Sequence, residues 1–129
     1  MTKDMLDELY MALAQDDRLQ DVCVKSFVRP EGLEDDKPSV VIKPVSSPIQ
    51  AVRGSNTSLA KRYIFQINVE SINYLECKKI QKIVEEHFEA KGFYQMTDAM
   101  SNLEDYLPTI QRYVDVRTYQ GLSPLYQNY

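Results

Sequence analysis

Residues 61–70 have the sequence KRYIFQINVE, in which large apolar side chains recur at every second position. This period matches an extended chain, whose successive side chains point to opposite faces of a sheet. Aromatic and β-branched residues are also the types that favour strands. The run therefore predicts a strand with one face buried in a core, and that face carries Tyr63, Phe65, Ile67 and Val69.

Two other segments have the apolar period of an amphipathic helix. Residues 3–15 follow Thr2, an expected N-cap, and carry acids in the first turn, where the helix dipole favours them. Residues 73–91 end before Gly92, a residue that often stops helices. The expected core stripes are Met5, Leu6, Leu9, Tyr10 and Leu13 in the first helix, and Cys77, Ile80, Val84 and Phe88 in the second.

Four further segments are expected to complete the sheet. Residues 22–28, 39–43, 93–97 and 109–119 are predicted strands, and residues 98–108 are predicted to form a loop or a single turn. The resulting order is α-β-β-β-α-β-β. It predicts an α+β fold, in which two helices pack on one face of a mainly antiparallel sheet of about four to five strands. The other face of the sheet is expected to meet solvent or a neighbouring subunit.

The last predicted strand has two faces of different character. Its apolar face is expected to carry Ile110, Val114 and Val116. Its other face mixes aromatic and charged side chains, namely Tyr113, Asp115, Arg117 and Tyr119.

Residues 44–60, PVSSPIQAVRGSNTSLA, form the least regular segment. They contain two prolines and one glycine but no acid, and they lie between the second and third predicted strands. The composition predicts a long loop, so that the unit resembles a hairpin with an overgrown tip. A loop of this length is uncommon inside a compact domain and is usually functional or disordered.

The length of 129 residues and the 43% hydrophobic content fit one globular domain, expected over residues 1–121, with a C-terminal tail at residues 122–129. Cys23 and Cys77 are too few for a disulfide framework or a four-ligand zinc site. They are expected to be small buried residues of a reducing compartment. No run of about 18 apolar residues and no secretory signal is present, so no membrane partner is expected.

No pattern in the sequence indicates a catalytic or cofactor site. His87 is the only histidine, and it is either a nucleophile's partner or a residue on the flank of the second helix. Glu34, Asp35 and Asp36 lack the alternation of a calcium loop, and Gly54 stands outside any phosphate-binding pattern. We therefore expect no enzyme activity, no metal and no cofactor.

The charge is unevenly distributed along the chain. Residues 1–36 hold ten acids and four bases, whereas residues 37–69 hold five bases and no acid. The basic stretch is open to three interpretations: solubilising charge, contact with DNA, or a protein interface that meets an acidic surface of a neighbouring copy. The nine tyrosines, without any tryptophan, fit either core filling or a protein interface.

The segments described above also resemble a known family when taken together. The features that carry the likeness are the N-terminal helix, the strand SVVIKP, the long polar loop with Gly54-Ser55-Asn56, the strand YIFQINV, the helix ending at Gly92-Phe93-Tyr94, and the turn from Asp105 to Pro108 that leads into TIQRYVDVR. The chain is similar to the small neck and tail-joining proteins of long-tailed bacteriophages that infect Gram-positive hosts. These include tail terminator and tail completion (head–tail joining) proteins.

The resemblance implies a structural virion protein that forms a homohexameric ring at the head-proximal end of the tail tube. Such a ring ends tube growth or joins the tail to the head. The implied partners are copies of the chain itself, the tail tube protein and the head connector or stopper protein, with DNA only passing through the lumen. The implied location is the virion tail or neck, after assembly in the host cytoplasm. The expected protein-interface residues are Lys43, Ser47, Ile49, Gln50, Arg53, Asn56, Lys61, Arg62, Tyr113, Arg117 and Tyr119.

A second hypothesis belongs to another class of function. A chain of this size and composition also suits a small cytosolic domain that binds a ligand or regulates a partner as a dimer. The oligomeric state separates the two hypotheses.

Overall fold

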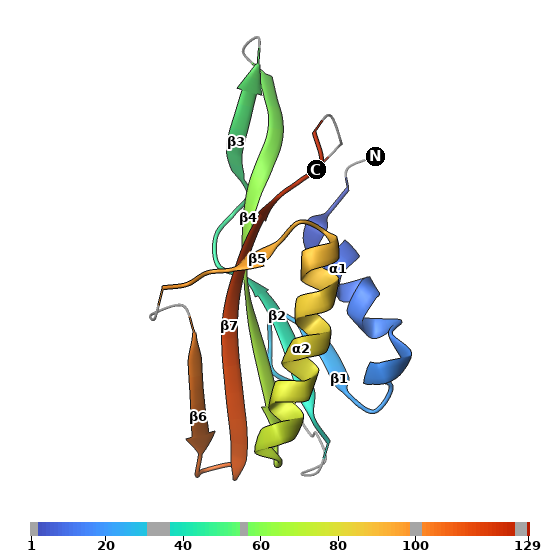
Figure 1. The fold of residues 1–129 in the computed structure, drawn as a ribbon, viewed down its shortest axis with the longest axis vertical. Coiled ribbons are helices and arrows are strands. Elements are labelled where there is room, and N and C mark those ends of the chain that lie inside the picture. Colours follow the sequence, from blue (N-terminus) through green and yellow to red (C-terminus); the bar gives the residue numbers. More distant parts are fainter. Residues whose placement is uncertain (1–2, 31–36, 55–56, 99–101, 126–128) are drawn as a thin grey trace.

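A computed structural model describes residues 3–30, 37–54, 57–98, 102–125 and 129. In these residues, seven strands form one mixed sheet, and two helices cover one of its faces (Figure 1). In chain order the elements are α1 (Met5–Ala14), the short 3₁₀ helix η1 (Asp17–Leu19), β1 (Cys23–Ser26), β2 (Ser39–Pro44), β3 (Ile49–Gly54), β4 (Thr57–Ser71), α2 (Tyr74–Ala90), β5 (Tyr94–Gln95), β6 (Leu103–Leu107) and β7 (Arg112–Leu122).

Strand β4 is the centre of the sheet because it pairs with three other strands. On one edge, its first part pairs with β3 and its second part with β2, both antiparallel. Its other edge pairs with β7 from Arg62 to Ser71. The far edge of β7 carries β6 and β5 in turn, and β1 lies parallel to β2 at the opposite side of the sheet.

The class α+β is therefore consistent with the structure, but the predicted sheet was wrong. The sheet has seven strands, and β1 and β2 run parallel, with Cys23 opposite Ser39 and Ser26 opposite Ile42. The two strands that were not predicted, β3 and β6, come from segments expected to be loops. Strand β3 lies within residues 44–60, together with the start of β4, and β6 lies within residues 98–108. Their side chains are mostly exposed, so main-chain pairing forms these strands without the buried alternation on which the prediction relied.

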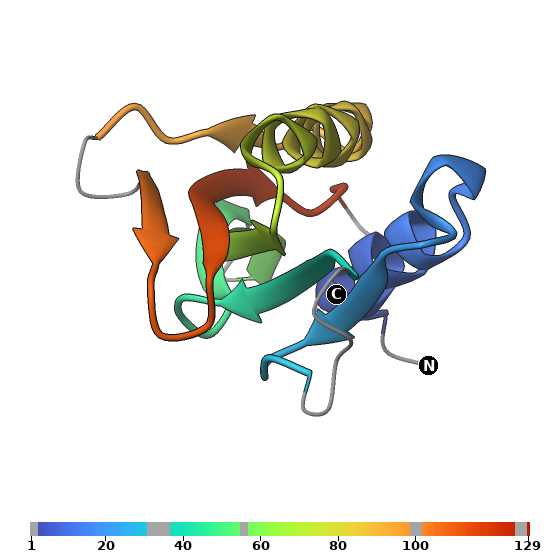
Figure 2. The same cartoon turned by 90° about the horizontal axis from the view of Figure 1, so that it is seen from below.

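The hydrophobic core lies between the helices and the covered face of the sheet. Figure 2 shows the arrangement of helices and sheet from below. Helix α2 packs against β4 and β7, and α1 packs against α2, β1 and β2. The predicted face of the central strand is confirmed, since Tyr63, Phe65, Ile67 and Val69 are all buried. The helices contribute Met5, Leu9, Leu13, Cys77, Ile80, Ile83, Val84 and Phe88 to the same core.

Both ends of α2 have local causes, of which the stop at Gly92 was predicted. The side chain of Asn73 accepts hydrogen bonds from the backbone N–H groups of Leu75 and Glu76, and so caps the helix. Gly92 follows the helix with a φ of 83°, a conformation that glycine adopts without steric cost. Helix α1 starts after Asp4, and the predicted cap Thr2 lies outside the described residues.

The face of β7 that meets the helices is the mixed aromatic and charged face, although the other face has the more apolar sequence. The mixed face of the strand lies under the helices, where Asp115 is 2% exposed and Tyr119 is fully buried. The ring of Tyr119 lies 4.8 Å from that of Phe88 of α2, measured between centroids. Val114 lies on the opposite face, and Ile110 precedes the strand and is 37% exposed. Alternation in a sequence separates two faces, but it does not say which of them the helices cover.

The chain beyond β7 returns to the body of the domain. Ser123 exchanges two hydrogen bonds with Lys61, one from its backbone N–H and one to its hydroxyl oxygen. Further on, the Tyr129 ring meets that of Tyr63 edge to face, and its hydroxyl donates to Glu8 of α1. Burial and the neighbouring carboxylate raise the pKa of Tyr129 to about 12. The last residue therefore packs against the chain's own first helix.

Candidate protein-interaction surfaces

The β3–β4 hairpin projects beyond the rest of the sheet, and we call its residues 49–62 the arm (Figure 1). Its two strands pair from Ile49 opposite Arg62 to Gly54 opposite Thr57, with register shifts on either side of Val52. The expectation of a long loop at residues 44–60 was therefore wrong for most of that segment. Because the two strands are already paired, the arm does not need to fold when it meets a partner.

Hydrogen bonds from two directions hold the root of the arm. On one side, the backbone N–H of Ser123 donates to the Lys61 carbonyl at 2.8 Å, and Lys61 N–H donates to the Ser123 hydroxyl at 2.9 Å. On the other side, the backbone N–H of Val45 donates to the carbonyl of Ile64 at 2.9 Å. The arm is therefore an extension of the sheet, with a fixed direction.

The arm is basic and partly apolar on its surface. Arg53 and Arg62 are exposed, Lys61 is half-buried, and no acid occurs between residues 49 and 62. Ile49 is 43% exposed, and Gln50 accepts a hydrogen bond from the Arg53 guanidinium at 3.2 Å. Such a surface can pack apolar area against a partner while its guanidinium groups bind carboxylates or stack on aromatic rings.

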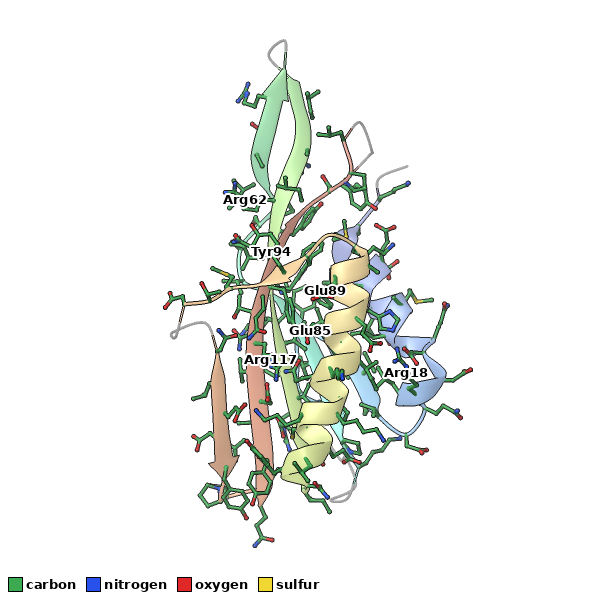
Figure 3. All side chains as sticks on the ribbon, viewed as in Figure 1. Arg18, Arg62, Glu85, Glu89, Tyr94 and Arg117 are labelled. Carbon is green, nitrogen blue, oxygen red and sulfur yellow. The ribbon has the colours of Figure 1, made fainter. Side chains whose placement is uncertain are left out.

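Seven of the expected interface residues thus cluster on or beside the arm. Besides the arm residues just described, Lys43 is exposed at the end of β2, and Ser47 is exposed in the turn that leads to β3. Arg62 lies at the base of the arm near Tyr94, and the two side chains line one groove there (Figure 3). Asn56 lies outside the described residues.

The three expected interface residues of β7 lie apart from the arm. Tyr119 is fully buried, so its side chain has no surface to offer a partner, and we leave it out of the interface. Arg117 donates to the carboxylate of Asp115 at 3.1 Å and lies half-buried near α2 (Figure 3). Tyr113 is half-buried between the rings of Tyr74 and Tyr106, with centroid distances of 5.7 and 4.9 Å.

These rings belong to an exposed apolar surface that the sequence analysis did not find. We call it the aromatic end, and its residues are Ile72, Tyr74, Leu75, Tyr106, Ile110 and Tyr113. The start of α2 and the β6–β7 turn form the end of the molecule opposite the arm (Figure 1). Leu75 is 72% exposed, Ile72 is 50% exposed, and Tyr74 and Tyr106 are each 43% exposed. A sequence signal did exist, since Leu75 lies outside the predicted core stripe of its helix.

Acids of β6 border the aromatic end. Glu104 pairs with Lys78 of α2 and accepts a hydrogen bond from the Tyr74 hydroxyl at 3.1 Å. The Asp105 carboxylate accepts from the backbone N–H of Tyr106 at 2.8 Å, and no base pairs with it among the described residues. Asp105 lies opposite Val114, on the face of the sheet away from the rings, so the acid on the ring side is Glu104, which Lys78 already pairs.

The buried polar groups under α2 are bonded mainly to each other. Gln81 is fully buried, and its side-chain amide donates to the Asp115 carbonyl at 2.9 Å and to the Ile67 carbonyl at 3.3 Å. The Asp115 carboxylate pairs with Arg117 and lies 3.6 Å from the Lys78 ammonium. These contacts join α2 to the centre of the sheet, and we assign them to folding.

The side chains that could take part in chemistry make contacts that fit a structural role. The ring nitrogen Nε2 of His87 lies 2.6 Å from the Asp16 carboxylate, which also binds Arg18. Burial raises the pKa of the Cys77 thiol to about 11, so the thiol stays protonated at neutral pH. In the part of the chain that the structure describes, no three His, Cys, Asp or Glu side chains come together as possible metal ligands.

A groove of about 610 Å³ lies at the root of the arm, between the start of α1, the end of β1 and the turn after β2. Its walls are apolar side chains and serines, with Asp4 as the one carboxylate that lines it. Phe27, at its edge, has a φ of 71° and is 58% exposed. The groove is open to solvent, and no charged pair or buried polar side chain in its lining indicates a particular ligand.

Comparison with known protein families finds no model that matches the chain, and comparison with curated proteins finds no match either. Neither helix within the described residues is long and apolar enough to cross a membrane.

Proposed function

We propose that the chain is a structural protein of a phage tail or neck. In this proposal it forms a ring, expected to be a homohexamer, at the head-proximal end of the tail tube, and it ends tube growth or joins the tail to the head. The proposal rests on the resemblance of the sequence to tail terminator and tail completion proteins. The observation that carries it furthest is the projecting basic arm.

The arm supports a role in assembly because it projects from the domain, which leaves its surface available to another molecule. The hairpin projects beyond the rest of the sheet, and within the described residues its outer strand β3 pairs with β4 alone, along one edge. An unpaired strand edge is a template for association with another chain. The basic charge favours an acidic partner and disfavours wrong ones, which suits a contact that must form in one register.

The proposed mechanism is geometric. Copies associate through exposed surfaces and charge, and the ring then presents one face to the tail tube protein and the other to the head connector or stopper. DNA passes through the lumen without being read. The chain would act in the virion, after assembly in the host cytoplasm. Two chemically different ends of one subunit, the arm and the aromatic end, suit a particle that must contact different neighbours.

The test is removal of the arm's tip in a phage that carries this gene. Val52 and Ala60 face each other across the hairpin, so replacing residues 53–59 with Asn-Gly joins them through a two-residue hairpin turn. The variant is expected to keep the circular dichroism spectrum and thermal midpoint of the native chain, but not to complement loss of the gene. Electron microscopy should then show unattached heads together with tails that are unjoined or of irregular length.

A point variant with a matched control sharpens the test. Arg53→Glu reverses a charge on the arm, and Lys82→Glu makes the same change on the exposed side of α2. Only the Arg53 variant should impair assembly. Assembly of the native protein should also weaken as the salt concentration rises, because salt screens the attraction between exposed charges. Normal virions after deletion of the gene would refute the proposal. A fixed dimer that binds a small ligand would favour a regulatory domain in its place.

A further inference from the structure

We infer that the first helix of one copy docks on the uncovered face of the sheet of a second copy. The inference rests on the proposed function, because it names the contact by which copies would associate into a ring. It assigns a partner to the surface around Arg62 and a role to the exposed side of α1.

The face of the sheet that the helices leave uncovered carries an exposed patch at the root of the arm. Because Tyr63 points into the core, its neighbour Arg62 points to the opposite face, together with the residues that the register places beside it. Ile49 and Leu122, which flank Arg62 on β3 and β7, are each 43% exposed. We call the group the sheet patch, and its residues are Lys43, Ile49, Arg62, Tyr94 and Leu122.

The sheet patch is basic and has no acid of its own. Lys43 and Arg62 are exposed, and in the part of the chain that the structure describes no carboxylate pairs with either of them. Asp105, an exposed acid on the same face, lies in the row of Glu70. That row is about 26 Å along β4 from Arg62 at the rise of an extended chain. The two bases are therefore available to the carboxylates of a partner.

The outer side of α1 is acidic and has an apolar centre. Helical spacing brings five exposed residues together on the side opposite the buried Met5, Leu9 and Leu13. We call them the outer stripe of α1, and they are Asp4, Asp7, Met11, Ala14 and Gln15. No base occurs between residues 4 and 17, and among the described residues no base pairs with the carboxylate of Asp4 or Asp7.

The outer stripe and the sheet patch complement each other in charge and in shape. A groove of about 340 Å³ is lined by Arg62, Tyr94 and Leu122 among others, and the first two lie together at the base of the arm (Figure 3). Met11 is 42% exposed, and its unbranched side chain can fill a groove of this kind. The carboxylate of Asp7, one turn away, then comes close to the bases of the patch. A helix packed on a sheet is also the usual way in which proteins cover a sheet face.

The placement of the two surfaces determines the kind of assembly. Helix α1 packs by its buried side into the core on the covered face, whereas the sheet patch lies on the opposite face. One copy therefore cannot bring its own two surfaces together. The contact is head-to-tail, and each copy has one helix to give and one sheet patch to receive. Contacts of this type close into rings when the rotation between neighbours permits it.

Disulfide trapping between two differently tagged variants tests the contact. Both carry Cys23→Ser, which removes the partly exposed cysteine, and the buried Cys77 remains. Leu122→Cys protein is mixed with Met11→Cys protein under mild oxidation, and in parallel with Lys82→Cys protein, whose new thiol lies on the exposed side of α2. We expect the mixed disulfide with Met11→Cys to form at least tenfold faster. Absence of that product, or equally fast trapping at position 82, would overturn the inference.

A charge swap provides the second measurement. Arg62→Glu and Asp7→Arg are each expected to weaken self-association about tenfold in sedimentation, whereas Lys82→Glu should leave it unchanged. A 1:1 mixture of the first two variants should recover the association, because each supplies the charge that the other has lost. If the mixture stays as weak as either variant alone, or if the native chain remains monomeric at its highest soluble concentration, the inference fails.

The phage separates this inference from the proposed function. Tails that join normally when either charge is reversed would remove the contact between α1 and the sheet patch but leave the proposed function standing. Normal tails in a phage without the gene would instead remove the proposed function.

Discussion

Gly121 packs so closely against Phe93 that any side chain at this position should strain the root of the arm. A Cβ atom added to Gly121 would lie 2.6, 2.8 and 2.9 Å from three ring carbons of Phe93. Carbon atoms without a bond prefer separations of about 3.5–4.0 Å, so one of the two groups would have to move by about 1 Å. The ring cannot move freely, because it is 1% exposed and lies 5.7 Å from both Phe65 and Phe88.

Gly121→Ala is therefore expected to lower the free energy of unfolding by about 2 kcal/mol, within the usual range for an overpacked core. For a domain of this size that corresponds to a fall of roughly 8 °C in the thermal midpoint. Urea unfolding followed by circular dichroism gives the measurement. Gly54→Ala is the matched control, since its Cβ would meet only the end of the Leu59 side chain, at 3.1 Å, and should change stability by less than about 0.5 kcal/mol.

A double-mutant cycle tests the cause of the loss. Phe93→Leu removes part of the ring and should cost about 1–2 kcal/mol alone, because it leaves a cavity. In that background, Gly121→Ala should cost about 1 kcal/mol less than in the native chain, because the clash is relieved. Equal costs in both backgrounds, or a native-like Gly121→Ala variant, would show that this close approach is not what limits position 121.

Three further predictions concern buried or paired groups. The raised pKa of Cys77, about 11 against a usual 9.0, means that the folded state disfavours the thiolate. The free energy of unfolding should keep its full value below about pH 9 and fall by about 2 kcal/mol as the pH rises to 11. Urea titrations at several pH values should show a smaller fall for Cys77→Ala. The hydrogen bonds from Arg18, first of all, hold the pKa of Asp16 well below its usual range, so the stability from this carboxylate is present above pH 4 and is lost as the pH falls. Asp16→Asn should accordingly reduce the difference in unfolding free energy between pH 6 and pH 3. Asp115→Asn should cost about 2–4 kcal/mol, because Arg117 then loses its buried partner, and a loss below 1 kcal/mol by thermal unfolding would contradict that view.

The candidate interface was only partly predictable from sequence. The bases of the arm were predicted because a stretch with basic residues and no acid can be recognised from the sequence alone. The aromatic end was missed because Tyr74 and Tyr106 lie far apart in sequence and meet only through Tyr113 of β7. Tyr119 was included in the expected interface, but the packing against Phe88 places it in the core.

The sequence by itself determined the features that depend on neighbouring residues. The buried face of β4 follows from an alternation of period two, and the C-terminal limit of α2 follows from Gly92. These signals are local, because a strand alternates and a helix ends for reasons contained within a few residues.

Only the tertiary structure decided the number of strands, the parallel pairing of β1 with β2, and the face of β7 that meets the helices. Strands β3 and β6 have few buried side chains, so their main-chain pairing with β4 and β7 leaves little trace in their composition. A strand can form wherever an edge offers unpaired backbone groups, and which edges remain open is settled only after the rest of the chain has packed.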